Sequence, residues 1–245
     1  DQTPARLADR CTLGIETLWK IARLGVAGWH VEHSRWSFDL RGGPSGIALL
    51  DRDQPGVESS QDSGRLVSLL PVDQDVLPQV SEQFVRGDEL HVTYPQGAGI
   101  FELKIVLRPI ESTANRLVLQ ATIAIQTDRL DTHPQIDVVA SGRAIAFHEP
   151  ADPAASDRGS APISVATDAD HAVGILLGQQ DSPFTTNHSS DSRLALRLFG
   201  DFLEKGVIRK ARPWIVISRN TDPPSMSDLE ARWRELCASP LPLTA

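Results

Sequence analysis

The chain has 245 residues, of which 24 are basic and 32 acidic, so its net charge is −8, and 40% of its residues are apolar. Because this acidic balance offers no chain-wide positive field to a phosphate backbone, nucleic acid is excluded as an expected partner. No stretch of about 18 apolar residues occurs, so the sequence predicts no helix that spans a bilayer. The apolar share is ordinary for a globular protein and predicts a sizeable core.

The first predicted element is an amphipathic helix within an N-terminal segment of residues 1–26. Its apolar stripe, at spacings of three and four, consists of Leu7, Cys11, Ile15, Leu18 and Ala22. From Trp29 the apolar period changes to two, and the alternating run 36–40 predicts a strand that ends at a Gly-Gly-Pro turn. A polar stretch over 51–64 predicts a long loop.

The middle of the chain shows the clearest strand pattern. A turn at Arg86–Glu89 between two apolar runs predicts a β-hairpin. Two longer alternating runs, 101–107 and 117–125, each predict a strand with one buried face, and a loop at 109–115 is expected to connect them.

Further strand-like runs follow in the second half of the chain, at 136–140, 144–147, 163–166, 172–177, 194–199 and 207–217. A second helix is predicted at 225–238, with Ser227 and Glu230 as its capping box, before an extended tail at 239–245. Many strands, no regular alternation of strands with helices, and helices only at the two ends predict an all-β fold. We expect one domain spanning 1–245, a large antiparallel β-sandwich with an N-terminal and a C-terminal α-helix.

Two cysteines, Cys11 and Cys237, are too few for a disulfide framework and lie near opposite ends of the chain. Two buried thiols are the simpler expectation, and one bond joining the chain ends is the alternative in an oxidising compartment. Because the chain begins at Asp1 rather than at an initiator Met, we expect that an N-terminal piece has been removed or left out. Both a cytoplasmic and an exported location therefore stay open.

The stretch Phe84 to Ala140, with long alternating strands that end in the segment Gln126 to Pro134, resembles the central sheets of supersandwich proteins related to galactose mutarotase. Two other stretches, Phe202 to Arg212 and Ser239 to Thr244, resemble an uncharacterised bacterial family of the planctomycete type. The first resemblance implies a supersandwich-like fold with a concave sheet that faces a sugar. It also implies a histidine acid and a glutamate base, as mutarotases use, without assigning them to positions of this chain.

Candidate catalytic residues follow from what a mutarotase needs: one group that takes the proton from the anomeric hydroxyl and another that protonates the ring oxygen. A histidine and a carboxylate suit these tasks near neutral pH. Among seven histidines we single out His91, on the strand after the hairpin turn, and His133, which precedes a proline, with Asp131 and Asp137 as their carboxylates. The competing interpretation, which the sequence favours, is that these are surface or hydrogen-bonded side chains.

Metal-binding patterns in the sequence are unspecific. On a strand, His30 and Glu32 would share a face while His33 would point the other way, so the three would not converge on one ion. Three Asp-x-Asp pairs lack the loop pattern of a calcium site, and turn-capping aspartates explain them. No glycine-rich nucleotide motif and no serine hydrolase elbow occur, so neither a metal nor a cofactor is predicted.

A local basic cluster supplies the candidate ligand-binding residues. Lys210, Arg212 and Trp214 would share one face of a strand. Arginine grips a carboxylate through two parallel hydrogen bonds, and an indole face stacks on a sugar, so an acidic sugar or a partner's carboxylates would fit. The competing interpretation is an edge strand over 207–217 that its charges and Pro213 protect from aggregation.

The sequence favours a non-catalytic domain that binds carbohydrate or another protein. One alternative is an aldose-1-epimerase-like enzyme, which would need a histidine and a carboxylate converging in one concave pocket. Another is a structural subunit that assembles through an exposed sheet edge. The sugar-binding hypothesis requires exposed aromatic side chains, of which five Trp, one Tyr and seven Phe offer a small supply.

Overall fold

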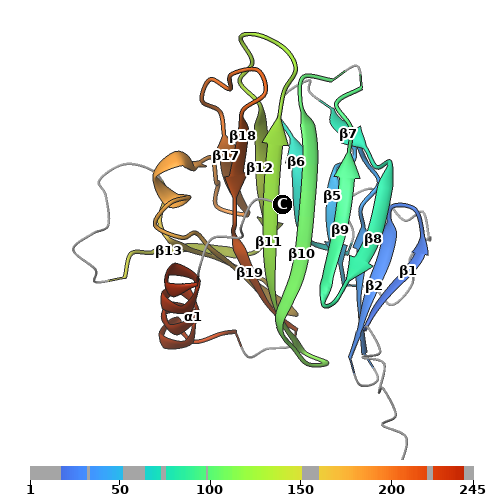
Figure 1. The fold of residues 1–245 in the computed structure, drawn as a ribbon. Helices are drawn as coiled ribbons and strands as arrows, with labels where there is room; N and C mark the ends of the chain where they lie inside the picture. Colours follow the sequence, from blue (N-terminus) through green and yellow to red (C-terminus); the bar gives the residue numbers. More distant parts are fainter. Residues whose placement is uncertain are drawn as a thin grey trace, which may run out of the picture.

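Two large antiparallel sheets form the fold of the protein, seen here in a computed structural model (Figure 1). The structure describes residues 18–31, 34–51, 64–72, 76–97, 99–150, 160–219 and 223–239. An eight-stranded sheet contains, in spatial order, β1 (Trp19–Arg23), β2 (Val26–Val31), β3 (Ser34–Asp39), β5 (Ile47–Leu50), β6 (Arg65–Pro71), β12 (Gln135–Ser141), β17 (Arg193–Phe199) and β16 (Thr186–Asn187).

The second large sheet has nine strands. In spatial order these are β13 (Ala144–His148), β14 (Ile163–Thr167), β15 (His171–Leu176), β19 (Trp214–Arg219), β11 (Arg116–Gln126), β10 (Glu102–Ser112), β9 (Glu89–Tyr94) and β8 (Glu82–Arg86), and β18 (Ile208–Ala211) also pairs with β11. A small two-stranded sheet pairs β4 (Gly42–Gly43) with β7 (Leu77–Gln79), and Ser182–Phe184 forms the 3-10 helix η1. The all-β, sandwich-like class is therefore confirmed.

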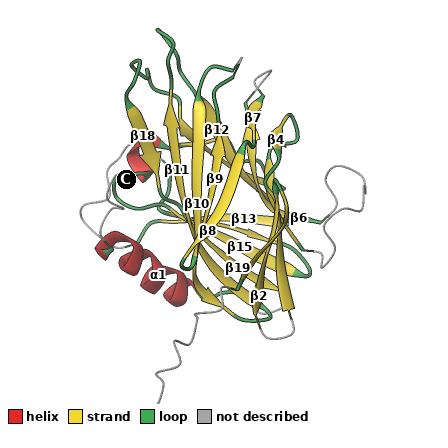
Figure 2. Cartoon of the chain, turned by 45° about the vertical axis from the view of Figure 1, so that its right-hand side comes forward, coloured by secondary structure: helices red, strands yellow, loops and turns green. Residues whose placement is uncertain are grey.

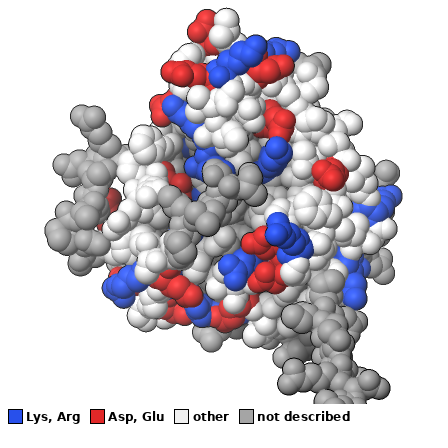
Figure 3. Space-filling model, viewed as in Figure 1, with Lys and Arg blue, Asp and Glu red and all other residues white. Residues whose placement is uncertain are grey.

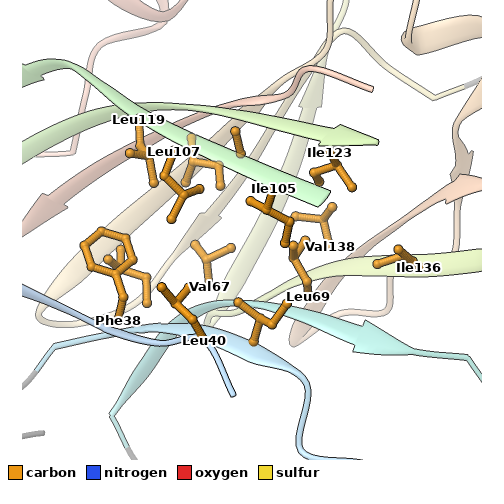
Figure 4. Close-up of a cluster of buried hydrophobic side chains, with 14 of the residues drawn as sticks. Phe38, Leu40, Val67, Leu69, Ile105, Leu107, Leu119, Ile123, Ile136 and Val138 are labelled. Carbon is orange, nitrogen blue, oxygen red and sulfur yellow. The ribbon is translucent and has the colours of Figure 1, made fainter. Parts of the chain in front are cut away.

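The main core lies between the two large sheets, where their inner side chains point toward one another (Figure 4). Strand alternation produces it: along β10, Leu103, Ile105 and Leu107 are buried while Lys104 between them is exposed, as the sequence predicts. From the opposite sheet, Phe38 and Val67 meet them. The packing leaves a cavity of about 40 Å³ between the sheets, with apolar walls.

Three tryptophans tie the two sheets together at one end of the sandwich. Trp19, Trp29 and Trp36 lie in register across β1, β2 and β3, and all three are buried. Each indole N–H donates a hydrogen bond in or next to a hairpin turn of the other sheet: to Asp88 O at 2.9 Å, to Ser112 Oγ at 2.9 Å and to Thr113 O at 3.2 Å, respectively. A buried indole needs such a partner, so these bonds fix the hairpin turns of the nine-stranded sheet.

Helix α1 (Met226–Ala238) covers part of the outer face of the nine-stranded sheet, next to β14 and β15 (Figure 2). Its Leu229, Trp233 and Leu236 are buried in a second, smaller core, to which Cys237 adds. Cys11 lies outside the described residues, so its relation to Cys237 stays a prediction. Among the residues that the structure describes, no helix is long and apolar enough to cross a membrane.

The predicted N-terminal helix is wrong where the structure describes the chain. Residues 18–26 run through β1, a tight turn and the start of β2, and the rest of the segment 1–26 lies outside the described residues. Two features override the helical spacing: Gly25 takes a φ of 75° in the turn, and Trp19 pairs with Trp29 across it. Burial of the indole row decides the conformation.

Three smaller expectations also change. The loop predicted at 109–115 is mostly strand, because β10 continues through a bulge next to Pro109 up to Ser112. The run 207–217 is not one edge strand: it breaks into β18 and β19 at residues 212–213, and β19 lies between β15 and β11. The C-terminal helix is confirmed, but its N-cap is Ser225 rather than Ser227.

Candidate functional site

The four residues predicted for catalysis lie in three different places. His91 stands on the outer face of the nine-stranded sheet, since Leu90 and Val92 on either side of it face the core. Asp137 lies on the outer face of the other sheet, because Ile136 and Val138 point inward. His133 and Asp131 belong to the connection between β11 and β12 and are exposed.

Asp137 forms an ion pair with Arg197. Its buried carboxylate accepts hydrogen bonds from Arg197 of β17, at 2.9 Å from Nε and 3.2 Å from Nη2, and the two residues are paired in register. His133 packs its ring against Phe202 at 5.8 Å between centroids. The fold therefore does not bring Asp131 or Asp137 to His91.

The predicted ligand-binding residues are also separated. Lys210 on β18 is exposed, whereas Arg212 and Trp214 are buried. The Arg212 Nη2 donates to the carbonyl oxygens of Leu236 and Ser239, each at 3.2 Å, and so caps the C-terminal end of α1. Because the Trp214 indole lies in the core beneath α1, only Lys210 of these three is open to a ligand.

The structure instead groups His91 with two residues of the hairpin formed by β8 and β9. His91 Nε2 lies 3.1 Å from Glu89 Oε2, and the imidazole stacks on the Phe84 ring with centroids 4.8 Å apart and planes within 2° of parallel. Phe84 is 42% exposed although it is a large apolar side chain. We call Phe84, Glu89 and His91 the hairpin site.

Cross-strand pairing explains why these side chains meet. Phe84 of β8 lies directly opposite His91 of β9, and Val106 of β10 continues the row on the other side. Because β8 is the last strand of the sheet within the described chain, no further strand covers the Phe84 ring on the side away from His91. The result is an aromatic ring with one face stacked and the other at the sheet edge.

Polar residues surround this row on the same outer face. The next cross-strand row on this face consists of Glu82, Thr93 and Lys104. At the hairpin turn, Arg108 Nε lies 3.1 Å from Asp88 Oδ2. Figure 3 views the molecule onto this face, where the surface over β8 to β10 is mostly uncharged with separate acidic and basic side chains around it. Trp19 holds the Asp88 carbonyl from below, so the hairpin has a fixed position.

The hairpin site offers hydrogen-bonding and stacking groups rather than an opposed acid and base. Glu89 and His91 are two residues apart on one strand face and bond to each other, so they cannot stand on opposite sides of a sugar ring. This contact occupies the Nε2 edge of the imidazole, whereas no hydrogen bond within the described residues occupies Nδ1. No three His, Cys, Asp or Glu side chains of the described residues gather as metal ligands would.

The sequence names His91 but misses the role of Phe84. The missing signal is the register of the hairpin: once the turn at Arg86–Glu89 is predicted, Val85 falls opposite Leu90 and Phe84 opposite His91.

No protein-family model matches the chain, and no curated protein matches it.

Proposed function

We propose that this protein is a non-catalytic carbohydrate-binding β-sandwich and that the hairpin site binds the sugar. The observation that supports this proposal best is the exposed Phe84 ring, stacked on His91 at the edge of an otherwise polar sheet face. A sugar ring has one C–H-rich face, which is attracted to the negative face of an aromatic ring. Its hydroxyl groups need donors and acceptors, which Glu89, Thr93 and Lys104 supply nearby.

Binding fits the geometry better than catalysis does. A sugar epimerase must reach both the anomeric hydroxyl and the ring oxygen with separate proton carriers inside a pocket that excludes water. The hairpin site is an open surface, and its histidine and glutamate are already bonded to one another. Stacking with hydrogen bonds to hydroxyl groups needs neither a pocket nor a proton transfer.

The test compares two phenylalanines of similar exposure on opposite edge strands of the same sheet. Phe84 is 42% and Phe147, on β13, is 44% exposed. In calorimetric titrations with a panel of neutral and acidic oligosaccharides, we expect Phe84→Ala to weaken binding about tenfold, which corresponds to about 1.4 kcal/mol. Phe147→Ala is expected to bind as the unmodified protein does.

Three outcomes would contradict the proposal. If no oligosaccharide binds, a protein partner replaces sugar as the ligand of this face. If Phe147→Ala weakens binding as much as Phe84→Ala, the sugar site lies elsewhere. If polarimetry shows that the protein accelerates the interconversion of sugar anomers and His91→Gln abolishes this, the protein is an epimerase and not a simple binder.

A further inference from the structure

We propose a second binding site, for an oxyanion, on the outer face of the eight-stranded sheet, formed by Lys20, His30 and Arg35 above Ser37. This site is on the other large sheet from the hairpin site and does not depend on it. The ligand class is a sulfate, phosphate or carboxylate group, either as a free ion or as part of a larger molecule. Two observations support the site: basic side chains gather on one sheet face, and buried hydrogen-bond donors next to them lack acceptors.

Strand alternation puts these residues on one face. In β1, β2 and β3 the tryptophans Trp19, Trp29 and Trp36 point into the core, so the residues next to them point outward. The outward neighbours are Lys20, His30, Arg35 and Ser37. His30 and Arg35 are directly paired between β2 and β3, so their Cβ atoms are neighbours.

Gly28 allows the Arg35 side chain to lie flat on the sheet. A Cβ atom at position 28 would be only 2.4 Å from Arg35 Nε, so the guanidinium occupies the space above the glycine. Gly28 is paired with Lys20 on one side and with Ser37 on the other. The arginine therefore leans across β2 into the row that contains Lys20.

Two buried polar atoms of the proposed oxyanion site lack a hydrogen-bond partner within the part of the chain that the structure describes. Arg35 Nε and Ser37 Oγ are both buried without a hydrogen-bond partner among the described residues, and Ser37 is 0% exposed. Leaving a buried charged donor without an acceptor costs more than leaving a neutral one, so such groups are usually paired. An oxyanion above the guanidinium would supply acceptor oxygens, and arginine binds planar and tetrahedral oxyanions through paired hydrogen bonds.

The electrostatics agree with an anionic ligand. Burial lowers the pKa of His30, and the positive charges of Arg35 and Lys20 lower it further. Arg35 is paired with His30 on β3, and Lys20 lies on β1, the other neighbour of β2. A bound oxyanion would offset both fields and favour the protonated imidazole, so it would add a third donor to the site.

The experiment follows the His30 imidazole by NMR while sodium sulfate is added at constant ionic strength, with sodium chloride as the balancing salt. We expect saturable shifts of the His30 resonances in sulfate and a higher His30 pKa in its presence. Arg35→Gln and Gly28→Ala, which removes the space for the guanidinium, are each expected to weaken sulfate binding about tenfold or more. Arg143→Gln, at an exposed ion pair with Asp168, is the matched control and is expected to bind sulfate normally.

The same titration with inorganic phosphate, glucuronate and a sulfated monosaccharide separates a free ion from an acidic group on a sugar. Tighter binding of an acidic sugar than of the free ion would assign the site to a carbohydrate, and equal binding would assign it to the oxyanion alone. Ser37→Ala removes one hydroxyl and tests the site without removing a charge. The proposal is wrong if sulfate acts on His30 no differently from chloride, or if folded Arg35→Gln and Ser37→Ala proteins both bind sulfate unchanged.

Discussion

At the scale of single residues, burial and hydrogen bonding push two carboxylates in opposite directions. Burial raises the pKa of Asp181, and the backbone N–H of Arg212, which donates to Oδ2 at 3.0 Å, offsets only part of this. Burial also acts to raise the pKa of Asp39, but hydrogen bonds from the side chain and backbone of Arg41 outweigh it and the pKa is lowered. The same residue type therefore has opposite effects on stability at two positions.

These directions predict opposite pH dependences for two matched variants. With a raised pKa, the stability that Asp181 contributes is present below the ordinary value of 3.8 and is lost as pH rises through the raised value. With a lowered pKa, the contribution of Asp39 is present above 3.8 and is lost as pH falls through the lowered value. Denaturant unfolding from about pH 3 to pH 7 should therefore show Asp181→Asn gaining stability relative to the unmodified protein as pH rises, and Asp39→Asn losing it. Parallel pH curves for all three proteins would contradict both assignments.

At the scale of elements, strands were more predictable than their ends. The alternation over 101–107 and 117–125 predicts β10 and β11, because a strand that lies on the main core points every second side chain into it. The N-terminal segment misleads because Leu18 and Ala22 fit a helical stripe as well as a strand. Tertiary contacts distinguish the two, such as the Trp19 indole bond to Asp88 O, and local spacing carries no information about them.

The start of α1 gives a test at this scale, because two serines compete for the cap. Ser225 has extended backbone angles and its Oγ accepts from the Asp228 N–H at 3.2 Å, while Ser227 already lies within the helix. Ser225→Ala should reduce the free energy of unfolding by about 1 kcal/mol. Ser227→Ala should change the free energy of unfolding by less than about 0.5 kcal/mol, because the Ser227 hydroxyl bonds to Ser225 Oγ and does not cap the helix. If urea unfolding gives the larger loss for Ser227→Ala, the helix begins where the sequence pattern predicts.

At the scale of the whole molecule, the sequence predicts which class of fold forms but not which surfaces meet. The candidate His91 and Asp137 are both on strands, as expected, yet they stand on outer faces of different sheets. Sheet order decides this: β9 lies near one edge of the nine-stranded sheet, whereas β12 crosses to the other sheet between β6 and β17. Because strand order depends on pairings between distant segments, a period of two along the chain cannot reveal it.

Packing between the two sheets is the property of the whole molecule that can be tested most directly. Ala121 of β11 lines the cavity between the sheets, whereas Ala140 of β12 is equally buried in the core but does not line it. Ala121→Val adds two methyl groups that the cavity accommodates, and it should raise the free energy of unfolding by about 0.5–1 kcal/mol. Ala140→Val adds the same groups at a buried position outside this cavity, and it should lower that free energy by about 1–3 kcal/mol. Thermal and urea unfolding of the two variants measure the contrast, and equal destabilisation by both would show that the sheets pack without the cavity.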